Sequence, residues 1–275
     1  MELTRNITLG VYLPGDTTIH RLDPRTKISA AMVLLALLFF IKTYTAFVFF
    51  AAFMAALVLL TRIPVKYVLS GLKPMLPVLL IMWLCQLFLQ KPPGSEIIFS
   101  LWIFKASDAG LRLGTLMSIR VILLYLVVTV LTMTTSLVEL ADGAEALLKP
   151  FRKIGVPSQE LAMTGIIALR FVPTLAEELE KIVKAQMARG VAFDRGNFIQ
   201  RTAKIFPVLL PLFINAFKRG EELITAMEAR NYTGGSGRTK MKVLKMCRCD
   251  AGAFIVLFIF AAGMVALIVM VGPPY

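Results

Sequence analysis

The stretch that decides the fold class reads Leu113-Gly-Thr-Leu-Met-Ser-Ile-Arg120-Val-Ile-Leu-Leu-Tyr-Leu-Val-Val-Thr-Val-Leu-Thr-Met133. It contains one charged residue, and a helix of about 20 apolar residues is long enough to cross a bilayer. Four further apolar runs are Ile28–Ile41, Ala46–Leu60, Met75–Gln90 and Ala251–Gly272. Hydrophobic residues make up 57% of the chain and charged residues only 17%. This balance predicts an all-α integral membrane protein.

The first two runs predict a helical hairpin that turns at Lys42-Thr-Tyr-Thr45. Each run is short, and one helix over residues 28–60 would be about 50 Å long, more than a bilayer needs. The basic segments 61–73 and 238–248 are expected on the cytoplasmic side. The sequence therefore predicts about five transmembrane helices, with a cytoplasmic amino terminus and a carboxyl terminus outside.

The segment between the fourth and fifth spans predicts long amphipathic cytoplasmic helices. It alternates charged residues with apolar stretches that are too short to span and contain Pro173, Pro207 and Pro211. Three parts follow: residues 1–135, with the amino-terminal segment and spans 1–4; residues 136–250, the cytoplasmic or interfacial region; and residues 251–275, the last span. The expected helices of the middle part are Leu137–Arg152, Ser158–Phe171, Thr174–Arg189, Asn197–Lys218 and Arg219–Arg230.

Two segments of this middle part end alike. They read Ala185-Gln-Met-Ala-Arg189-Gly190 and Ala226-Met-Glu-Ala-Arg230-Asn231. Gly and Asn tolerate the left-handed conformation that closes many helices. One such ending is ordinary capping, but two with matching Ala spacing indicate arginines that enter grooves of a partner protein, since a guanidinium bonds acceptors in two directions. The flexible side chains of Met187 and Met227 suit the same contact.

Arg120 lies inside the fourth apolar run, where a charge is costly. Two interpretations stand side by side: pairing with backbone carbonyls between spans, or a place in a transport pathway.

The sequence lacks the residue patterns that several kinds of site require. Gly234–Arg238 is rich in glycine but lacks the Gly-Lys-Ser/Thr ending of a phosphate-binding loop, so this chain is not expected to hydrolyse ATP or to hold a cofactor. Cys247 and Cys249 are expected to be reduced thiols and not part of a metal site. The net charge of +13 is spread beside apolar runs, which favours membrane lipid over nucleic acid as a partner. An enzyme is disfavoured because the apolar runs hold no catalytic constellation.

Motifs along nearly the whole chain carry a family resemblance. They are Gly10-x-Tyr12, His20-Arg-Leu-Asp-Pro-Arg-Thr-Lys27, Leu169-Arg-Phe-Val-Pro173, the Ala185–Gly190 segment, and Ala226-Met-Glu-Ala-Arg230 followed by Tyr232. Together they resemble the transmembrane (T) component of energy-coupling factor vitamin transporters. One departure is Asn231, where the family usually has Gly, a mild change because Asn also adopts the left-handed cap.

The resemblance implies a scaffold in the bacterial plasma membrane, not an enzyme. Two ABC-type ATPase subunits, which bring ATP and Mg, would bind the two tails, and a membrane S component would bind the vitamin. The implied ATPase-coupling residues are Ala188, Arg189, Gly190, Ala229, Arg230 and Asn231, with weaker contacts at Met187, Met227 and Glu228. The apolar faces of Leu161–Phe171 and Ile205–Phe217 are expected to contact the S component, above all through Ile205, Leu209, Phe213 and Phe217.

Two alternatives to a vitamin transporter remain open at this stage. The first is the permease of a dedicated cobalt or nickel importer of the same class. The extended amino terminus resembles the shared type that serves several S components more than this dedicated type. The second is a self-contained membrane carrier with Arg120 in its pathway.

Overall fold

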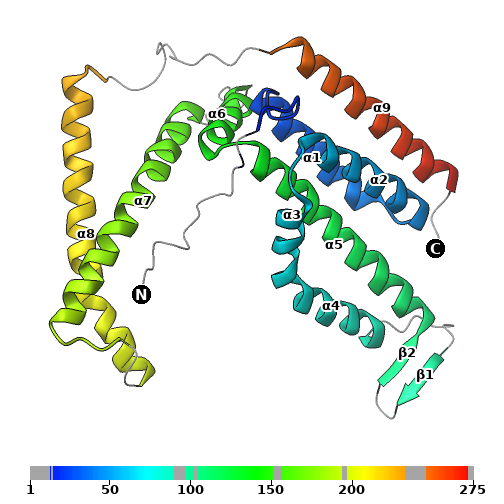
Figure 1. The fold of residues 1–275 in the computed structure, drawn as a ribbon, viewed down its shortest axis with the longest axis horizontal. Helices are drawn as coiled ribbons and strands as arrows, with labels where there is room; N and C mark the ends of the chain where they lie inside the picture. Colours follow the sequence, from blue (N-terminus) through cyan, green and yellow to red (C-terminus); the bar gives the residue numbers. More distant parts are fainter. Residues whose placement is uncertain are drawn as a thin grey trace. The chain divides into compact units, whose positions relative to one another are not determined.

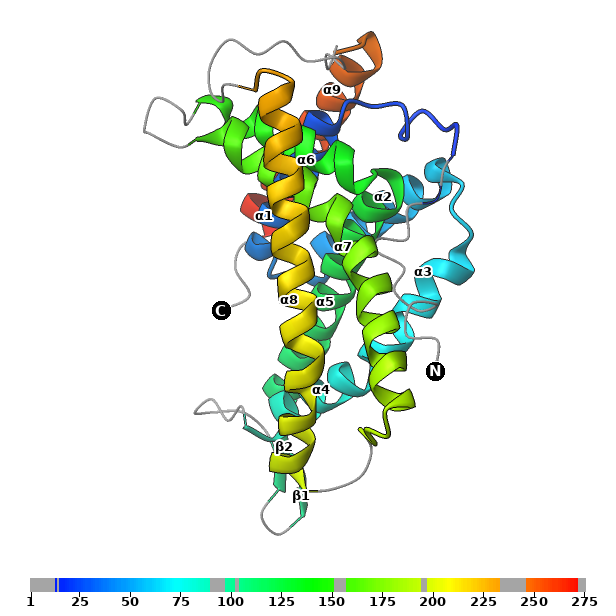
Figure 2. The same ribbon diagram turned by 90° about the vertical axis from the view of Figure 1, so that its left-hand side faces the viewer.

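The computed structural model describes residues 13, 15–89, 97–101, 104–150, 157–193, 197–232 and 246–271. Figures 1 and 2 show helices along almost all of the described chain. The helices are α1 (Pro24–Phe40), α2 (Tyr44–Thr61), α3 (Val65–Leu72), the 3₁₀ turn η2 (Lys73–Met75), α4 (Leu76–Leu89), α5 (Asp108–Thr134), α6 (Leu137–Leu148), α7 (Ser158–Ala188), α8 (Phe198–Ala229) and α9 (Arg248–Val271). The predicted all-α membrane protein is confirmed.

The chain divides into two compact units, which are described separately. A membrane unit comprises residues 10–143 and 244–275, and a helix-pair unit contains residues 144–243. The first holds α1 to α5, the start of α6, and α9; the second holds the end of α6 with α7 and α8.

The predicted hairpin at the start of the membrane unit is confirmed, because α1 and α2 are separate helices joined by residues 41–43. Asp23 caps α1 by accepting a hydrogen bond from the Arg25 amide at 3.0 Å, and Pro24 occupies the first helical turn. The largest fully buried side chains of this unit include Phe47, Phe50, Leu38, Met54 and Met264, from α1, α2 and α9. The two halves of the hairpin thus contribute to one core with the last span.

Four described helical segments are long and apolar enough to cross a membrane: Tyr44–Thr61, Lys66–Phe88, Gly110–Thr134 and Cys249–Met270. The second of them contains α3, η2 and α4, since Pro74 interrupts the regular hydrogen bonding near the expected start of the third span. Gly71 is needed there, because a Cβ atom would collide with the Tyr125 hydroxyl of α5. The α1 helix has 17 residues and is not among the four. That α1 also crosses the membrane, which would make five spans, therefore remains a prediction.

A short β-hairpin precedes α5, and the sequence did not predict it. Strand β1 (Ile97–Leu101) pairs antiparallel with β2 (Phe104–Ser107). It lies within the loop expected outside the membrane and leaves the helical fold class unchanged.

The helix-pair unit has fewer and longer helices than the sequence predicted. The expected break at Pro173 is wrong, because α7 continues through it for 31 residues. The expected boundary between Lys218 and Arg219 is also wrong, because both residues lie inside α8, a single helix of 32 residues that also contains Pro207 and Pro211. A proline removes only one backbone donor, and flanking Leu, Ala and Glu favour helix. At the second boundary Arg219 pairs with Glu178 of α7, which holds α8 in place.

Candidate functional site

The end of α7 is closed by a Schellman motif. The amide of Gly190 donates to the Met187 carbonyl at 2.9 Å, and the amide of Val191 donates to the Gln186 carbonyl at 3.1 Å. Gly190 has φ +90°, the left-handed conformation that glycine adopts without steric cost. Arg189 is thus the last residue before the chain reverses, and its side chain is exposed.

The end of α8 repeats this geometry bond for bond. The amide of Asn231 donates to the Glu228 carbonyl at 2.9 Å, and the amide of Tyr232 donates to the Met227 carbonyl at 3.0 Å. Asn231 has φ +58°, so the asparagine takes the left-handed cap that the sequence predicted. Arg230 therefore occupies the same position in its motif as Arg189, and it is exposed as well.

The two helices run antiparallel, as the colours in Figures 1 and 2 show. Near the α7 end, the Gln186 side chain donates to the Pro207 carbonyl at 3.2 Å, and the Lys204 ammonium donates to the Ala192 carbonyl at 2.7 Å. Further along, Glu178 pairs with Arg219. From the first contact to the last, the residue number decreases along α7 and increases along α8. The contacts therefore confirm that the two helices are antiparallel.

This arrangement places the two arginines at opposite ends of the helix pair. Lys204 lies beside the α7 end, and 26 residues of α8 separate it from Arg230. At 1.5 Å per residue the two ends are on the order of 40 Å apart. The two exposed arginine ends are therefore well separated.

An exposed apolar surface covers the first part of α8. Val208 is only 4% exposed, whereas Phe213 and Phe217 are 64% and 63% exposed. The ring centroids of these two phenylalanines lie 5.2 Å apart. The exposed members of this apolar arc are Ile205, Phe206, Leu209, Leu210, Phe213, Ile214 and Phe217. They include all four residues that the sequence assigned to the S component. An exposed apolar patch of this extent is typical of a protein or membrane contact.

Comparison with known proteins identifies the family. Residues 15–241 match the family described as cobalt transport protein. A relative from Thermosediminibacter oceani is 47% identical over 94% of this chain and 97% of its own length. Relatives from Ruminiclostridium cellulolyticum (44% identical, covering 90% and 92%) and Bacillus subtilis (41%, covering 94% and 96%) are similar over equally long stretches. All three are named energy-coupling factor transporter transmembrane protein.

The chain belongs to this family of energy-coupling factor transmembrane proteins. It is therefore a multi-pass membrane component of a transporter, as the family name and its apolar helices together show.

In this energy-coupling factor protein, Arg120 bonds to the α1–α2 turn. Its guanidinium donates to the carbonyl of Ile41, the C-cap residue of α1, and lies 5.8 Å from the centroid of the Phe47 ring. The last carbonyls of a helix have no partner within the helix, and Ile41 is buried, so a donor is needed at this position. The geometry matches the first of the two interpretations, pairing with backbone carbonyls.

A buried polar junction at the start of α1 and α9 was not predicted from the sequence. Asp250 is 2% exposed, and its carboxylate accepts from the Asp23 amide at 2.8 Å and from the Cys247 amide at 2.7 Å. The Lys27 ammonium donates to the carbonyls of His20 and Thr134, each at 2.9 Å. The Asp250 carboxylate thus accepts from amides at the amino-terminal ends of both α1 and α9, although Asp23 and Asp250 are 227 positions apart. Neither residue type nor spacing predicts that pairing.

The Glu178–Arg219 pair was also missed, although a signal for it exists. Arg189 and Arg230 are 41 positions apart, and Glu178 and Arg219 are separated by the same 41 positions. Glu178 therefore lies as far before Arg189 on α7 as Arg219 lies before Arg230 on α8. In an antiparallel pair, two such equivalent positions come together only where the helices cross.

Proposed function

We propose that this chain is the transmembrane scaffold of an ATP-driven importer, which links two ATPase subunits to a substrate-binding S component for vitamin uptake. One observation carries the proposal: the same capped Ala-Arg ending is presented twice, at opposite ends of an antiparallel helix pair. Two equivalent protruding ends on the order of 40 Å apart suit two related ATPases.

The proposed coupling residues act through shape and charge. Ala188 and Ala229 are small, so the walls of a groove approach the helix end closely. The guanidinium groups of Arg189 and Arg230 then reach acceptors inside, and their planar form holds a fixed orientation. Gly190 and Asn231 turn the chain away at once. Met187, Met227 and Glu228 border the contact, and the partner ATPases supply ATP and Mg.

The apolar arc on α8 is the proposed contact for the S component. The S component is itself a membrane protein, so its surface is apolar. It can therefore cover the arc without burying unpaired polar groups. Leu161 and Val172 of α7 are exposed as well. When ATP draws the two ATPases together, motion at the arginine ends moves the helices and reorients the S component so that it releases its vitamin inside.

The proposed topology adds α1, the first span in chain order, to the four candidate spans and so has five. The amino terminus and both arginine ends then lie in the cytoplasm of a bacterial cell, where ATPases operate, and the carboxyl terminus lies outside. A membrane-impermeant thiol reagent on intact cells tests this topology. It should label a Tyr275→Cys variant and should leave the native Cys247 and Cys249 unlabelled. Labelling of Cys247 in intact cells would reverse the orientation.

A dedicated metal-ion importer is the second candidate, because the matching family is described as cobalt transport protein. The two candidates differ in their membrane partners and share the two ATPase contacts. A self-contained carrier is less well supported, since the Arg120 guanidinium is engaged by the Ile41 carbonyl.

The deciding experiment is purification of the tagged chain from its native membrane in mild detergent, followed by mass spectrometry of the bound proteins. Two P-loop ATPase subunits and a small hydrophobic vitamin-binding subunit support the proposal. Metal-binding membrane subunits, recovered in place of the vitamin-binding subunit, support the dedicated metal-ion importer. A chain that is recovered alone and transports solute by itself supports the carrier.

Arginine variants test the coupling residues directly. Arg189→Ala and Arg230→Ala should each reduce ATPase recovery or uptake, and the double variant should abolish uptake while the protein remains inserted. Truncation of a central arginine in an interface costs about 2 kcal/mol or more, which corresponds to at least tenfold weaker binding. Uptake at the wild-type rate in the double variant would refute the proposed coupling.

A further inference from the structure

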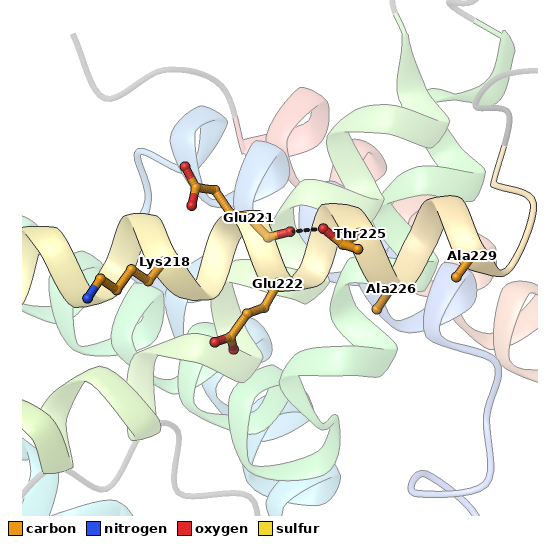
Figure 3. A pocket seen from close by; sticks show the side chains of 6 residues that line it. All are labelled: Lys218, Glu221, Glu222, Thr225, Ala226 and Ala229. Carbon is orange, nitrogen blue, oxygen red and sulfur yellow. Dashed lines mark hydrogen bonds between the residues drawn. The ribbon is translucent and has the colours of Figure 1, made fainter.

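The 41-position offset makes the two helix ends comparable residue by residue. Both ends carry alanines at equivalent positions, Ala185 with Ala226 and Ala188 with Ala229, followed by arginine. The charged residues near these alanines, in contrast, differ between the two helices. Figure 3 shows the face on α8, where Ala226 and Ala229 lie beside Thr225 in a shallow hollow that also includes Lys218, Glu221 and Glu222.

On α8 the order of charge runs from basic to acidic toward the arginine end. Lys218 comes first, and Glu221 and Glu222 follow, nearer to the alanines. All three side chains are exposed. A partner that covers this hollow therefore meets negative charge beside the alanine platform and positive charge one turn further back.

On α7 the order is reversed. Glu180 stands at the position of Glu221, so that position is acidic on both helices. The other three positions differ: Glu177 takes the place of Lys218, Lys181 takes the place of Glu222, and Lys184 takes the place of Thr225. These three α7 residues are exposed too. Lys184 pairs with Glu180 at 2.7 Å, yet 59% of its side chain stays accessible, whereas Glu180 is only 13% exposed. The face beside the α7 alanines is therefore positive.

The reversal is not explained by the packing of α7 on α8. The pairing of the helices has its own charged contact, Glu178 with Arg219, at the crossing. The reversed charges instead flank the exposed Ala-Arg ends. They can therefore act on whatever binds those ends.

We propose that the reversed charge order makes each end select a different ATPase groove. The α7 end, with Lys181 and Lys184, takes a groove whose rim is acidic beside the alanines. The α8 end, with Glu221 and Glu222, takes a groove whose rim is basic there. This inference rests on the proposed docking of ATPases and adds that Lys181, Lys184 and Glu222 decide which ATPase binds where. Charge complementarity of this kind acts chiefly by disfavouring the wrong partner.

The test places a photo-cross-linking amino acid at Met187 or at Glu228, which are equivalent positions of the two ends. The full chain is expressed with its co-purifying ATPases, and mass spectrometry identifies the ATPase captured by each probe. In the wild type, each probe should capture a different ATPase. The variant Lys181→Glu/Lys184→Thr gives α7 the α8 residues, so both probes should then capture the same ATPase.

The reciprocal variant adds Glu222→Lys/Thr225→Lys and leaves the net charge of the chain unchanged. It should exchange the two captured ATPases, with the ratio at each probe changing by about tenfold or more. The preference should weaken as salt is raised, because the charges are exposed.

The remaining outcomes separate the inference from the proposed function. An unchanged assignment in both swapped variants overturns the inference and leaves the docking intact. A complex with a single kind of ATPase polypeptide at both ends does the same. Failure of both wild-type probes to capture any ATPase overturns the docking itself, and with it the inference.

Discussion

Arg120 is the residue whose role the structure changes most. From the sequence, an arginine in an apolar run is equally compatible with a structural pair and with a transport pathway. Its bond to the Ile41 carbonyl and its place beside the Phe47 ring make it the cap of the α1 helix inside the membrane unit. The two interpretations predict different behaviour of variants.

We predict that Arg120→Ala lowers the thermal stability of the detergent-solubilised protein by about 1.5–3 kcal/mol, because the carbonyl end of α1 loses a charged donor. Arg120→Lys should be intermediate, since an ammonium reaches the same carbonyl without the planar fork. Arg112→Ala is the matched control: it is an exposed cation two turns away that lies over the Tyr44 ring, and it should change stability little. A stable Arg120→Lys protein without uptake would favour a transport role.

The caps show what local sequence does determine. Gly190 and Asn231 predicted left-handed residues, and both have positive φ. A cap depends only on the few residues around it, so its sequence signal is complete. The partner of Arg120 lies 79 positions away, and no local pattern contains that information.

At the scale of helices, the starts and ends of α7 and α8 were predictable within a few residues, whereas their continuity was not. Pro173, Pro207 and Gly220 each weaken a helix locally. The α8 helix nevertheless continues through Gly220, next to the contact of Arg219 with Glu178. Tertiary packing therefore overrides the local signal for a break. The β-hairpin was missed for a related reason, since two short strands outside the apolar runs give no clear periodicity.

The Glu178–Arg219 pair yields a prediction about how α7 and α8 cross. Glu178 is 14% exposed and Arg219 is 38% exposed, so the pair is partly shielded from water. Removing the positive partner with Arg219→Ala leaves a mostly covered carboxylate, and we expect a loss of about 1 kcal/mol after allowance for solvent screening. Spin labels on the two helices should report a broader distance distribution.

The exchanged pair, Glu178→Arg with Arg219→Glu, provides the control for this prediction. It keeps one positive and one negative group at the crossing, and it should restore a narrow distribution. Equal broadening in the exchanged pair and in the single variant would show that the attraction does not hold the crossing.

At the scale of the whole chain, the membrane unit is closed by residues from its two ends. Asp23 lies before the first helix and Asp250 lies at the start of the last one, and the bond between them is 2.8 Å long. Composition and hydropathy predicted the spans, because each span satisfies its own backbone and needs only apolar length. They could not predict which spans lie together. That information resides in single polar contacts of this kind.

Asp250 therefore provides a test of how the last helix is held. Its two carboxylate oxygens accept the amides of Asp23 and Cys247, which are donors at the starts of α1 and α9. Asp250→Asn replaces one acceptor oxygen by a donor group, so at least one of these buried amides loses its partner. The expected cost is about 1–3 kcal/mol, measured as a lower thermal midpoint in detergent. Cys249→Ser changes an exposed neighbour and should leave the midpoint unchanged. If Asp250→Asn matches the wild type, the junction does not hold α9 in place, and the apolar core that includes Phe260 and Met264 must do so.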